Sequence, residues 1–402
     1  MTFPFATEFV TEGSVTAVVP NLKAFVRKPS DYAPSKAPVF YNPVMELNRD
    51  LTVLALQSFQ RIERDTLTVC EPLSGCGIRA IRFAKEIDGI GEVVANDISK
   101  EAYRLIKHNT EINDLLNKVC VKNEDANLLL SRHAAPKKRF DCIDLDPFGS
   151  PMPYLDCALR ALRIGGLLAL TATDMAPLCG VHFKACLRKY GGKPLRTEYC
   201  HELATRLLAG ASAKSAAKYD IGLKVLFSHS LQHYTRLYCK TNYGAKKADN
   251  CLKSIGYIHH CFACFHRTVA PGTDYCGKRT CPKCGSKMSV AGPLWIGKII
   301  DEDFVASMEK EAETKVFRLK SKVDKLLDLT EKEANAPITY YVIDRICDKF
   351  ELPVPSISKV VGELKRTGQQ VCLTHFNTRG IKTDASAKKV KEAIISCLDS
   401  KT

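Results

Sequence analysis

The chain has 402 residues, of which 45% are hydrophobic, so it can build a sizeable core and has a length typical of two or three domains. Its 59 Lys and Arg outnumber 44 Asp and Glu, and the net charge of +15 favours a polyanionic partner, first of all nucleic acid. There is no apolar run of membrane-spanning length and no secretory signal pattern, so we expect neither a membrane protein nor a secreted one. The 18 cysteines fit a reducing cytoplasm better than a disulfide scaffold.

The first 38 residues read as a proline-interrupted arm with one short strand at 15–19. Apolar residues at helical spacing then predict a helix over 44–61. Arg49 lies on this helix and could face a ligand, although an arginine in such a place is more often solvated.

A strand over 67–73, a tight glycine loop over 74–79 and a helix from residue 80 form the next unit. Such a loop lets the backbone approach a ligand closely. It lacks the Gly-x-Gly-x-x-Gly fingerprint of dinucleotide binding, which disfavours a nicotinamide oxidoreductase. Its form, an acid at Glu71 followed by x-x-Ser-Gly-x-Gly, is typical of S-adenosylmethionine binding.

Acidic residues follow the next two predicted strands, at 92–97 and 119–122. Asp97 could bind both ribose hydroxyls of an adenosine. Asp125 could accept from the adenine amino group while Ala126 offers a backbone donor. Each acid alone reads as a surface turn residue, but acids after three consecutive strands, with a glycine loop after the first, indicate a nucleoside cofactor.

The fourth strand, over 140–145, leads into Asp144-Leu-Asp146-Pro147-Phe148. Asp146 can accept a hydrogen bond from an exocyclic amine, and Pro147 fixes the turn so that a nearby carbonyl can accept the second amine proton. Phe148 can stack on the ring that carries the amine. The alternative is a strand that ends in a solvated acidic turn.

Further elements complete a doubly wound α/β pattern of about seven strands with helical crossovers. We expect a helix over 152–163, a turn at Gly165-Gly166, a fifth strand over 167–173 and a second helix over 198–217. A closing antiparallel pair of strands is expected over 221–228 and 232–240.

After residue 240 the composition changes, and we expect a domain boundary there, between 1–240 and 241–402. Two Cys-x-x-Cys pairs within 256–297 predict a structural zinc site in which four thiolates leave no open position. Unliganded buried cysteines are the alternative. The predicted ligands are Cys261, Cys264, Cys281 and Cys284, and the other candidates are Cys276, His259, His260 and His266.

The last hundred residues predict a charged helix or helix pair over 301–335, helices over 338–350 and 356–367, and a hairpin over 371–383. Two helices followed by a hairpin resemble a winged-helix module, a common nucleic-acid platform. The basic tail around Lys388 and Lys391 is expected to fray.

Eight short motifs together resemble the tRNA guanine-26 N2-dimethyltransferases over residues 12–384. The block Asp-Leu-Asp-Pro-Phe-Gly at 144–149 is quite specific to that family. The resemblance implies a class I, Rossmann-like methyltransferase sheet followed by an α+β tRNA-binding domain. The motifs lie at 39–43, 47–50, 75–79, 96–99, 144–151, 171–174, 217–220 and 374–376.

Residue roles implied by the resemblance agree largely with the bottom-up assignments. Asp146 is the expected catalytic carboxylate, and Phe148 and Phe40 are expected to sandwich a flipped guanine. A four-cysteine zinc site marks a subset of the family that includes enzymes able to modify the neighbouring guanine at position 27. The residues expected to hold S-adenosylmethionine are Arg49, Arg79, Asp97, Asp125 and Ala126.

We therefore expect a monomeric, cytoplasmic enzyme that transfers one or two methyl groups to N2 of guanine 26 in tRNA. One alternative is an amino-methyltransferase that acts on ribosomal RNA, DNA or protein, because the Asp-Pro-Phe site alone permits it. Another is a non-catalytic zinc and winged-helix RNA-binding protein.

Overall fold

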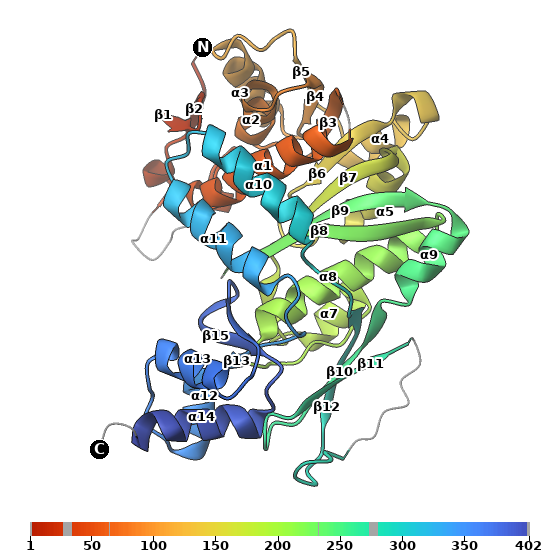
Figure 1. The fold of residues 1–402 in the computed structure, drawn as a ribbon. Helices are drawn as coiled ribbons and strands as arrows, with labels where there is room; N and C mark the ends of the chain where they lie inside the picture. The colour runs from red at the N-terminus through yellow and green to blue at the C-terminus, as the bar shows by residue number, and fades with distance from the viewer. Residues whose placement is uncertain (1, 27–33, 64, 232, 273–279, 400–402) are drawn as a thin grey trace.

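A seven-stranded sheet forms the centre of the computed structural model, which describes residues 2–26, 34–63, 65–231, 233–272 and 280–399 (Figure 1). The strand order is β5-β4-β3-β6-β7-β9-β8. The strands from β3 to β7 are parallel, and β9 is antiparallel to β7 and β8, as predicted. Their bounds are β3 Leu67–Glu71, β4 Ile90–Asn96, β5 Val119–Lys122, β6 Phe140–Leu145, β7 Leu162–Ala172, β8 Ile221–Leu231 and β9 Tyr234–Tyr243.

Helices cover this sheet on both sides (Figure 1). On one side α2 contacts both α1 and α3, and on the other α5 contacts both α4 and α8. Covering both faces explains why all six residues of β6 are buried. The helices are α1 Glu46–Glu63, α2 Ile78–Glu86, α3 Lys100–Glu111, α4 Ala126–Arg132, α5 Met152–Ala161, α6 Met175–Leu178, α7 Phe183–Tyr190, α8 Cys200–Ala217 and α9 Ala245–Leu252.

The N-terminal arm begins with an antiparallel hairpin of β1 (Thr7–Glu12) and β2 (Val15–Pro20). The strand over 15–19 was predicted, whereas β1 was not. Asn109 of α3 fastens the hairpin, since its side chain accepts from the Val18 N–H at 2.8 Å and donates to the Val18 carbonyl at 2.9 Å. The single turns η1 (Leu22–Phe25), η2 (Pro34–Lys36) and η3 (Pro43–Met45) lie between the hairpin and α1.

The predicted turn at Gly165-Gly166 is a bulge inside β7, which begins before it at Leu162, and Gly165 has φ +74°. The pairing of β6 with β7 shifts register between Phe140 and Cys142, and this irregularity accommodates the extra residues. A Cβ at Gly166 would lie 2.8 Å from the Asp141 carbonyl oxygen. The glycine therefore permits a close approach of two strands.

The chain after α9 forms a separate sheet of three strands and then returns to pack against the first half of the molecule. The order of this sheet is β11-β10-β12. The helix pair α10 and α11, which confirms the prediction for 301–335, packs on α1 (Figure 1). The elements are β10 Ile255–His260, β11 Arg267–Pro271, β12 Ser289–Trp295, α10 Glu302–Thr314 and α11 Lys320–Glu333.

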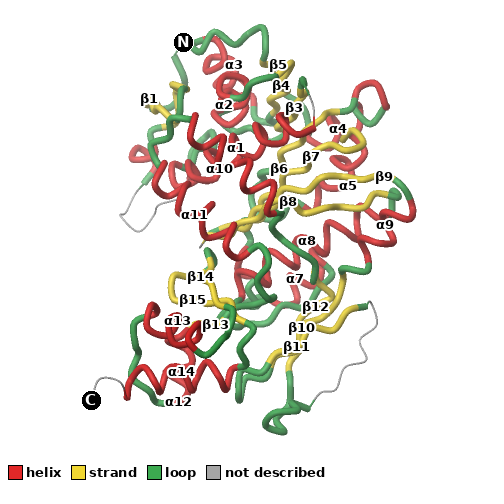
Figure 2. Tube along the Cα trace, in the orientation of Figure 1, coloured by secondary structure: helices red, strands yellow, loops and turns green. Residues whose placement is uncertain are grey.

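The last part of the chain has a hydrophobic cluster of its own and a small sheet in the order β13-β15-β14 (Figure 2). Two helices followed by a hairpin are as expected, whereas β13 was not predicted and α12 begins at Ile343 instead of residue 338. The winged-helix assignment stays a prediction. Fraying of the tail is wrong, because α14 buries Val390, Ala393, Ile394 and Cys397 along one face. The elements are β13 Tyr341–Val342, α12 Ile343–Phe350, α13 Ile357–Arg366, β14 Val371–Thr374, β15 Asn377–Thr383 and α14 Ala387–Asp399.

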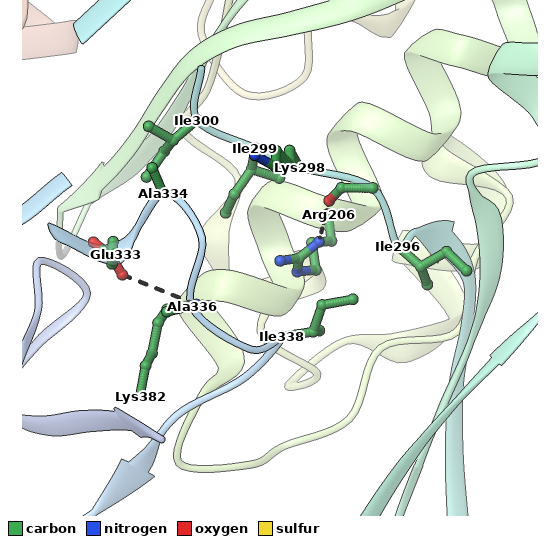
Figure 3. Close-up of a pocket in the computed structure, with 11 residues that line it drawn as sticks. Arg206, Ile296, Lys298, Ile299, Ile300, Glu333, Ala334, Ala336, Ile338 and Lys382 are labelled. Atoms are coloured by element: carbon green, nitrogen blue, oxygen red, sulfur yellow. Dashed lines mark hydrogen bonds and ion pairs between the residues drawn. The ribbon is translucent and has the colours of Figure 1, made fainter. Parts of the chain in front are cut away.

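Buried charges join this module to the sheet domain (Figure 3). Lys382 of β15 contacts Glu202 of α8 at 2.9 Å, and Arg206 contacts the same carboxylate at 2.8 Å. A cavity of about 120 Å³ beside them is lined by Arg206, Lys382 and Glu333, and by none of the strand-end acids. Within the described residues, no helix combines the length and apolarity that crossing a bilayer requires.

Candidate active site

Four acids form a row along one edge of the large sheet. Glu71 ends β3, Asp97 follows β4, Asp125 follows β5 and Asp146 follows β6. Parallel strands bring their carboxyl ends to the same edge, and the order β5-β4-β3-β6 makes these acids neighbours. The structure thus brings together the acids that the sequence singled out.

The glycine loop after β3 packs between Phe40 and Asp97. Gly75 has φ +55°, and a Cβ there would lie 2.8 Å from the Phe40 carbonyl oxygen, so only glycine fits without strain. Its N–H donates to Asp97 Oδ2 at 2.9 Å. The arm, the loop and the second acid are therefore held in one arrangement.

Asn96, which the sequence analysis did not single out, fixes the spacing of the loops at this edge. Its Nδ2 donates to the carbonyls of Pro72 and Glu124, both at 3.0 Å, and its backbone N–H donates to Ser74 Oγ at 3.1 Å. The side chain is fully buried at the end of β4. A polar residue at the end of a buried strand was the signal that could have found it.

Free hydrogen-bonding capacity remains where a nucleoside is expected. Asp97 is half-buried, and its two oxygens accept from Gly75 and Ser99 N–H groups, which leaves lone pairs for hydroxyl donors. Asp125 caps α4 by accepting from Leu128 N–H with Oδ1 alone. Ala126 is the first residue of α4, so its N–H has no partner within the helix. These groups fit the hydroxyls and the amino edge of an adenosine.

Asp146 lies at the mouth of a buried charge network. Arg79 donates to Asp146, and Arg236 from β9 lies below, where it donates to Asp144 Oδ1 at 2.9 Å. Burial raises the pKa of Asp146, but the positive charges of Arg79 and Arg236 outweigh burial and leave this pKa below the ordinary value. Asp146 therefore stays ionised at neutral pH.

Glu71 is a third carboxylate of this network. It is almost fully buried, 3.3 Å from Arg79 Nε, and accepts from the Ala80 N–H at 3.1 Å. Burial, together with the charges of Asp144 and Asp146, outweighs Arg79 and raises the pKa of Glu71 to about 8. Glu71 is therefore mostly protonated at neutral pH.

The two arginines expected to hold a cofactor are both buried and engaged with protein groups. Arg49 donates through Nε and Nη2 to Glu12, at 2.6 Å each, and Nη2 also reaches the Asn42 carbonyl. Besides Asp146, Arg79 donates to Asn48 Oδ1 at 2.8 Å. Glu12 is a further residue that sequence reasoning missed, because it lies in the arm far along the chain from its partner.

Phe40 and Phe148 meet beside Asp146. Their ring centroids are 4.5 Å apart and the rings are inclined by 81°, an edge-to-face contact. Phe148 is 66% exposed, so most of its side chain is open to a ligand. A base held between them needs about 7 Å, two stacking contacts of about 3.5 Å, so the rings must separate to admit one.

The four predicted zinc ligands come together from two loops, one that follows β10 and one that precedes β12. The Sγ atoms of Cys261 and Cys284 are 3.5 Å apart, those of Cys264 and Cys281 are 3.6 Å apart, and all four lie within 4.8 Å of one another. A tetrahedral site with Zn–S bonds of about 2.3 Å has S···S edges of about 3.8 Å, so the cysteines fit zinc closely.

The two cysteine pairs are built alike. In each, the first cysteine N–H donates to a carbonyl five residues later, at 2.9 Å for Cys261 and 2.8 Å for Cys281. Phe265 and Gly285, four residues after those cysteines, both have positive φ. The alternative ligand Cys276 lies outside the described residues, and His259, His260 and His266 are not part of the described cluster.

Comparison with known proteins identifies the family. The sequence model described as N2,N2-dimethylguanosine tRNA methyltransferase matches residues 13–395. The chain is 45% identical to the tRNA (guanine(26)-N(2))-dimethyltransferase of Methanobrevibacter smithii and 44% identical to that of Methanothermobacter thermautotrophicus. These alignments cover 90% and 96% of this chain, and 93% and 98% of those proteins.

A solved structure agrees with the sequence relatives. The complex of Trm1 from Pyrococcus horikoshii with S-adenosyl-L-methionine superposes with a TM-score of 0.84 at 36% identity. The match covers 96% of this chain and 99% of that one. With a matching family model, close relatives and a shared fold over nearly its whole length, the chain belongs to the N2,N2-dimethylguanosine tRNA methyltransferase family.

Proposed function

We propose that this chain transfers one or two methyl groups from S-adenosylmethionine to the exocyclic N2 of guanine 26 in tRNA. The observation that carries the proposal is Asp146, an ionised carboxylate at the carboxyl end of β6, beside exposed Phe148 and in line with the acids after β4 and β5. Family membership supplies the substrate, since the relatives are named for this reaction.

The cofactor site in this proposal lies along the carboxyl ends of β3, β4 and β5. Asp97 accepts from the ribose hydroxyls with its remaining lone pairs, and Asp125 and the N–H of Ala126 read the adenine. Arg49 and Arg79 place positive charge near the amino-acid end. S-adenosylmethionine, when bound, supplies a methyl group on a sulfonium centre.

Asp146 holds and orients the reacting amine. A guanine amino group is conjugated with its ring and is a poor nucleophile, so an acceptor that aims its lone pair out of the ring helps the transfer. Because Arg79 and Arg236 keep Asp146 ionised, it can accept an N–H bond until the methyl group has been transferred. Fixing both reactants in line is the main contribution that the protein makes.

The amine must lose a proton once it gains a methyl group. The cationic nitrogen on an aromatic ring is strongly acidic, so even a weakly basic carboxylate such as Asp146 can accept or relay that proton. A second methylation repeats the step after the product amine turns or rebinds. The protein's role is thus positioning and charge stabilisation.

The guanine must leave its stack to reach Asp146, which costs a few kcal/mol. Stacking on an aromatic ring returns about 1–3 kcal/mol per base. In this proposal Phe40 and Phe148 open from their edge-to-face contact and close on the two faces of the base.

The direct test is mass spectrometry of nucleosides from one defined tRNA transcript after incubation with the protein and S-adenosylmethionine. We expect N2-methylguanosine and N2,N2-dimethylguanosine from a transcript with guanine at position 26. We expect neither product from a transcript in which positions 26 and 27 are both adenine. Methylated guanosine from the transcript changed at position 26 alone would assign activity to position 27. Absence of any product from the unchanged transcript would refute the function.

An amino-methyltransferase that acts on ribosomal RNA, DNA or protein remains the rival within the same chemistry. Transfer of a labelled methyl group from S-adenosylmethionine to each of these polymers separates the two, since the proposal expects turnover on tRNA alone. The non-catalytic rival predicts no heat of S-adenosylmethionine binding in calorimetry.

We propose that Cys261, Cys264, Cys281 and Cys284 hold a structural zinc ion. Four thiolates complete a tetrahedron, so this ion has a structural role rather than a catalytic one. Elemental analysis of protein purified without chelator should find zinc, and Cys264→Ser should lower its content by one equivalent per chain. Folded wild-type protein without metal would refute this site.

The remaining expectations concern organisation. We propose a methyltransferase domain over 1–240 and a tRNA-binding domain over 241–402, in a monomer that acts in the cytoplasm. The basic net charge of +15 supports binding of a polyanion. Gel filtration tests whether the protein is a monomer. The tRNA affinity of an isolated 241–402 fragment tests whether this part binds tRNA.

A further inference from the structure

A second group of soft metal ligands lies away from the four cysteines. Cys179 is the C-cap of α6, and Cys200 and His201 begin α8. Each offers one ligand atom, and the three atoms lie within 4.8 Å of one another. All three residues are half-buried, so the group is enclosed but remains open to a small ion.

The hydrogen bonds around His201 determine which ring nitrogen can bind a metal. Ser230 Oγ donates its own proton to the Tyr234 carbonyl at 3.1 Å. The same Ser230 Oγ lies 3.4 Å from His201 Nδ1. Because its proton is already donated, it can only accept a hydrogen bond from the ring, so Nδ1 carries the hydrogen. The lone pair is then on Nε2, and an N–H held by a neighbouring oxygen is the usual support of a metal-binding histidine.

We propose that Cys179, Cys200 and His201 form a second metal site, which binds Zn²⁺ through two thiolates and one imidazole. Thiolate and imidazole ligands favour zinc over magnesium, calcium and manganese. Three protein ligands leave the fourth position to water. Binding forms two Zn–S bonds and one Zn–N bond, and releases the thiol protons to solvent.

The position of this site gives it a structural consequence for the Asp146 loop. The segment from Thr173 to Cys179 follows β7, and Thr173 exchanges two hydrogen bonds with Gly149 of the Asp-Pro-Phe-Gly motif, at 2.7 and 2.8 Å. An ion bound by Cys179 on α6 and by Cys200 on α8 ties that segment to α8.

Metal content of the untagged, full-length protein tests the site. We expect two zinc ions per wild-type chain, one in Cys200→Ser and one in His201→Gln. Cys264→Ser should also retain one, and its cobalt-substituted form should show thiolate-to-cobalt absorption that is lost when Cys200→Ser is added. Cys157→Ser, which removes a half-buried thiol from α5, is the matched control and should keep both ions.

Ser230→Ala keeps all three ligands and guards against variants that fail to fold. Loss of the oxygen that orients His201 should weaken zinc binding at this site about 10–100-fold, as losses of such supports do. The proposal is overturned if Cys264→Ser contains no metal, or if Cys200→Ser contains as much as the wild type. A Cys179–Cys200 disulfide in the purified protein would also overturn it.

Discussion

Asp146 owes its charge to two guanidinium groups that come from distant parts of the chain. Arg79 contacts it directly, and Arg236 lies below it through Asp144. Arg79 is shared by Glu71, Asp144 and Asp146, and burial with the charges of the two aspartates raises the pKa of Glu71 to about 8. The acid that meets the substrate is thus ionised while its neighbour is protonated.

Asp146→Asn should lower methyl transfer about 10²–10⁴-fold, because the amide keeps the shape of the side chain but loses its charge and half its acceptor capacity. Affinity for tRNA should stay unchanged in a filter-binding assay, since one small group is altered within a large basic surface. Asp156→Asn, an exposed change on α5, is the matched control. Turnover of Asp146→Asn near the wild-type rate would remove Asp146 from its role.

Glu71 should make stability depend on pH. Its pKa rises from 4.5 in the unfolded chain to about 8 in the folded one, so its contribution is fully present below 4.5 and lost as pH rises through 8. Glu71→Gln should abolish this dependence, so the wild type should lose stability relative to the variant between about pH 5 and about pH 8.

Urea unfolding at both pH values measures the difference. Glu92→Gln removes an exposed carboxylate from β4 and serves as the matched control. If wild type and Glu71→Gln changed equally with pH, Glu71 would not carry the proton.

The helix after β4, α3, begins at the sheet edge with a side-chain cap. Ser99 caps α3 by accepting from Ala102 N–H at 3.2 Å. Ser356 occupies the same position before α13, but its side chain makes no capping bond. The two serines therefore separate the effect of the bond from that of the residue type.

Ser99→Ala should reduce the free energy of unfolding by about 1 kcal/mol, the usual cost of a lost N-cap. Ser356→Ala should reduce the free energy of unfolding by only a few tenths of a kcal/mol, since no cap bond is lost. Urea titration of both variants checks the prediction, and equal losses would show that the cap bond of α3 contributes nothing.

At the scale of the whole molecule, ions buried between α8 and β15 join the C-terminal module to the sheet domain. Burial alone would raise the pKa of Glu202, but the charges of Lys382 and Arg206 lower it to about 2. This contribution to stability is present above pH 4.5, the unfolded value, and is lost as pH falls through 2. Neutralising Glu202 at low pH therefore weakens the junction.

Lys382→Met should cost about 3–5 kcal/mol, because it leaves a buried carboxylate short of a partner. Lys218→Met breaks an exposed pair with Asp156 and should cost less than about 1 kcal/mol. Thermal unfolding of the two variants compares them. A loss for Lys382→Met no larger than for Lys218→Met would mean that the junction does not depend on this ion pair.

Much of the fold and part of the site could be predicted because the signals are local. The apolar run of β6 and the acids after it lie within a few residues, and two Cys-x-x-Cys pairs set their own turn geometry. The local rule found the bend at Gly165-Gly166 but missed that β7 begins before it, at Leu162. It failed at α14, where burial of one face stabilises a basic helix.

The sequence by itself determined the parallel sheet, the row of acids along its edge and the four thiols, since periodicity and spacing are properties of short segments. Only the tertiary structure decided the partners of those groups. Arg236 is 92 residues from Asp144, and Glu12 is 37 residues from Arg49. Charge states and ligand sets arise from such contacts, because Coulomb energy and burial depend on distance in space rather than along the chain.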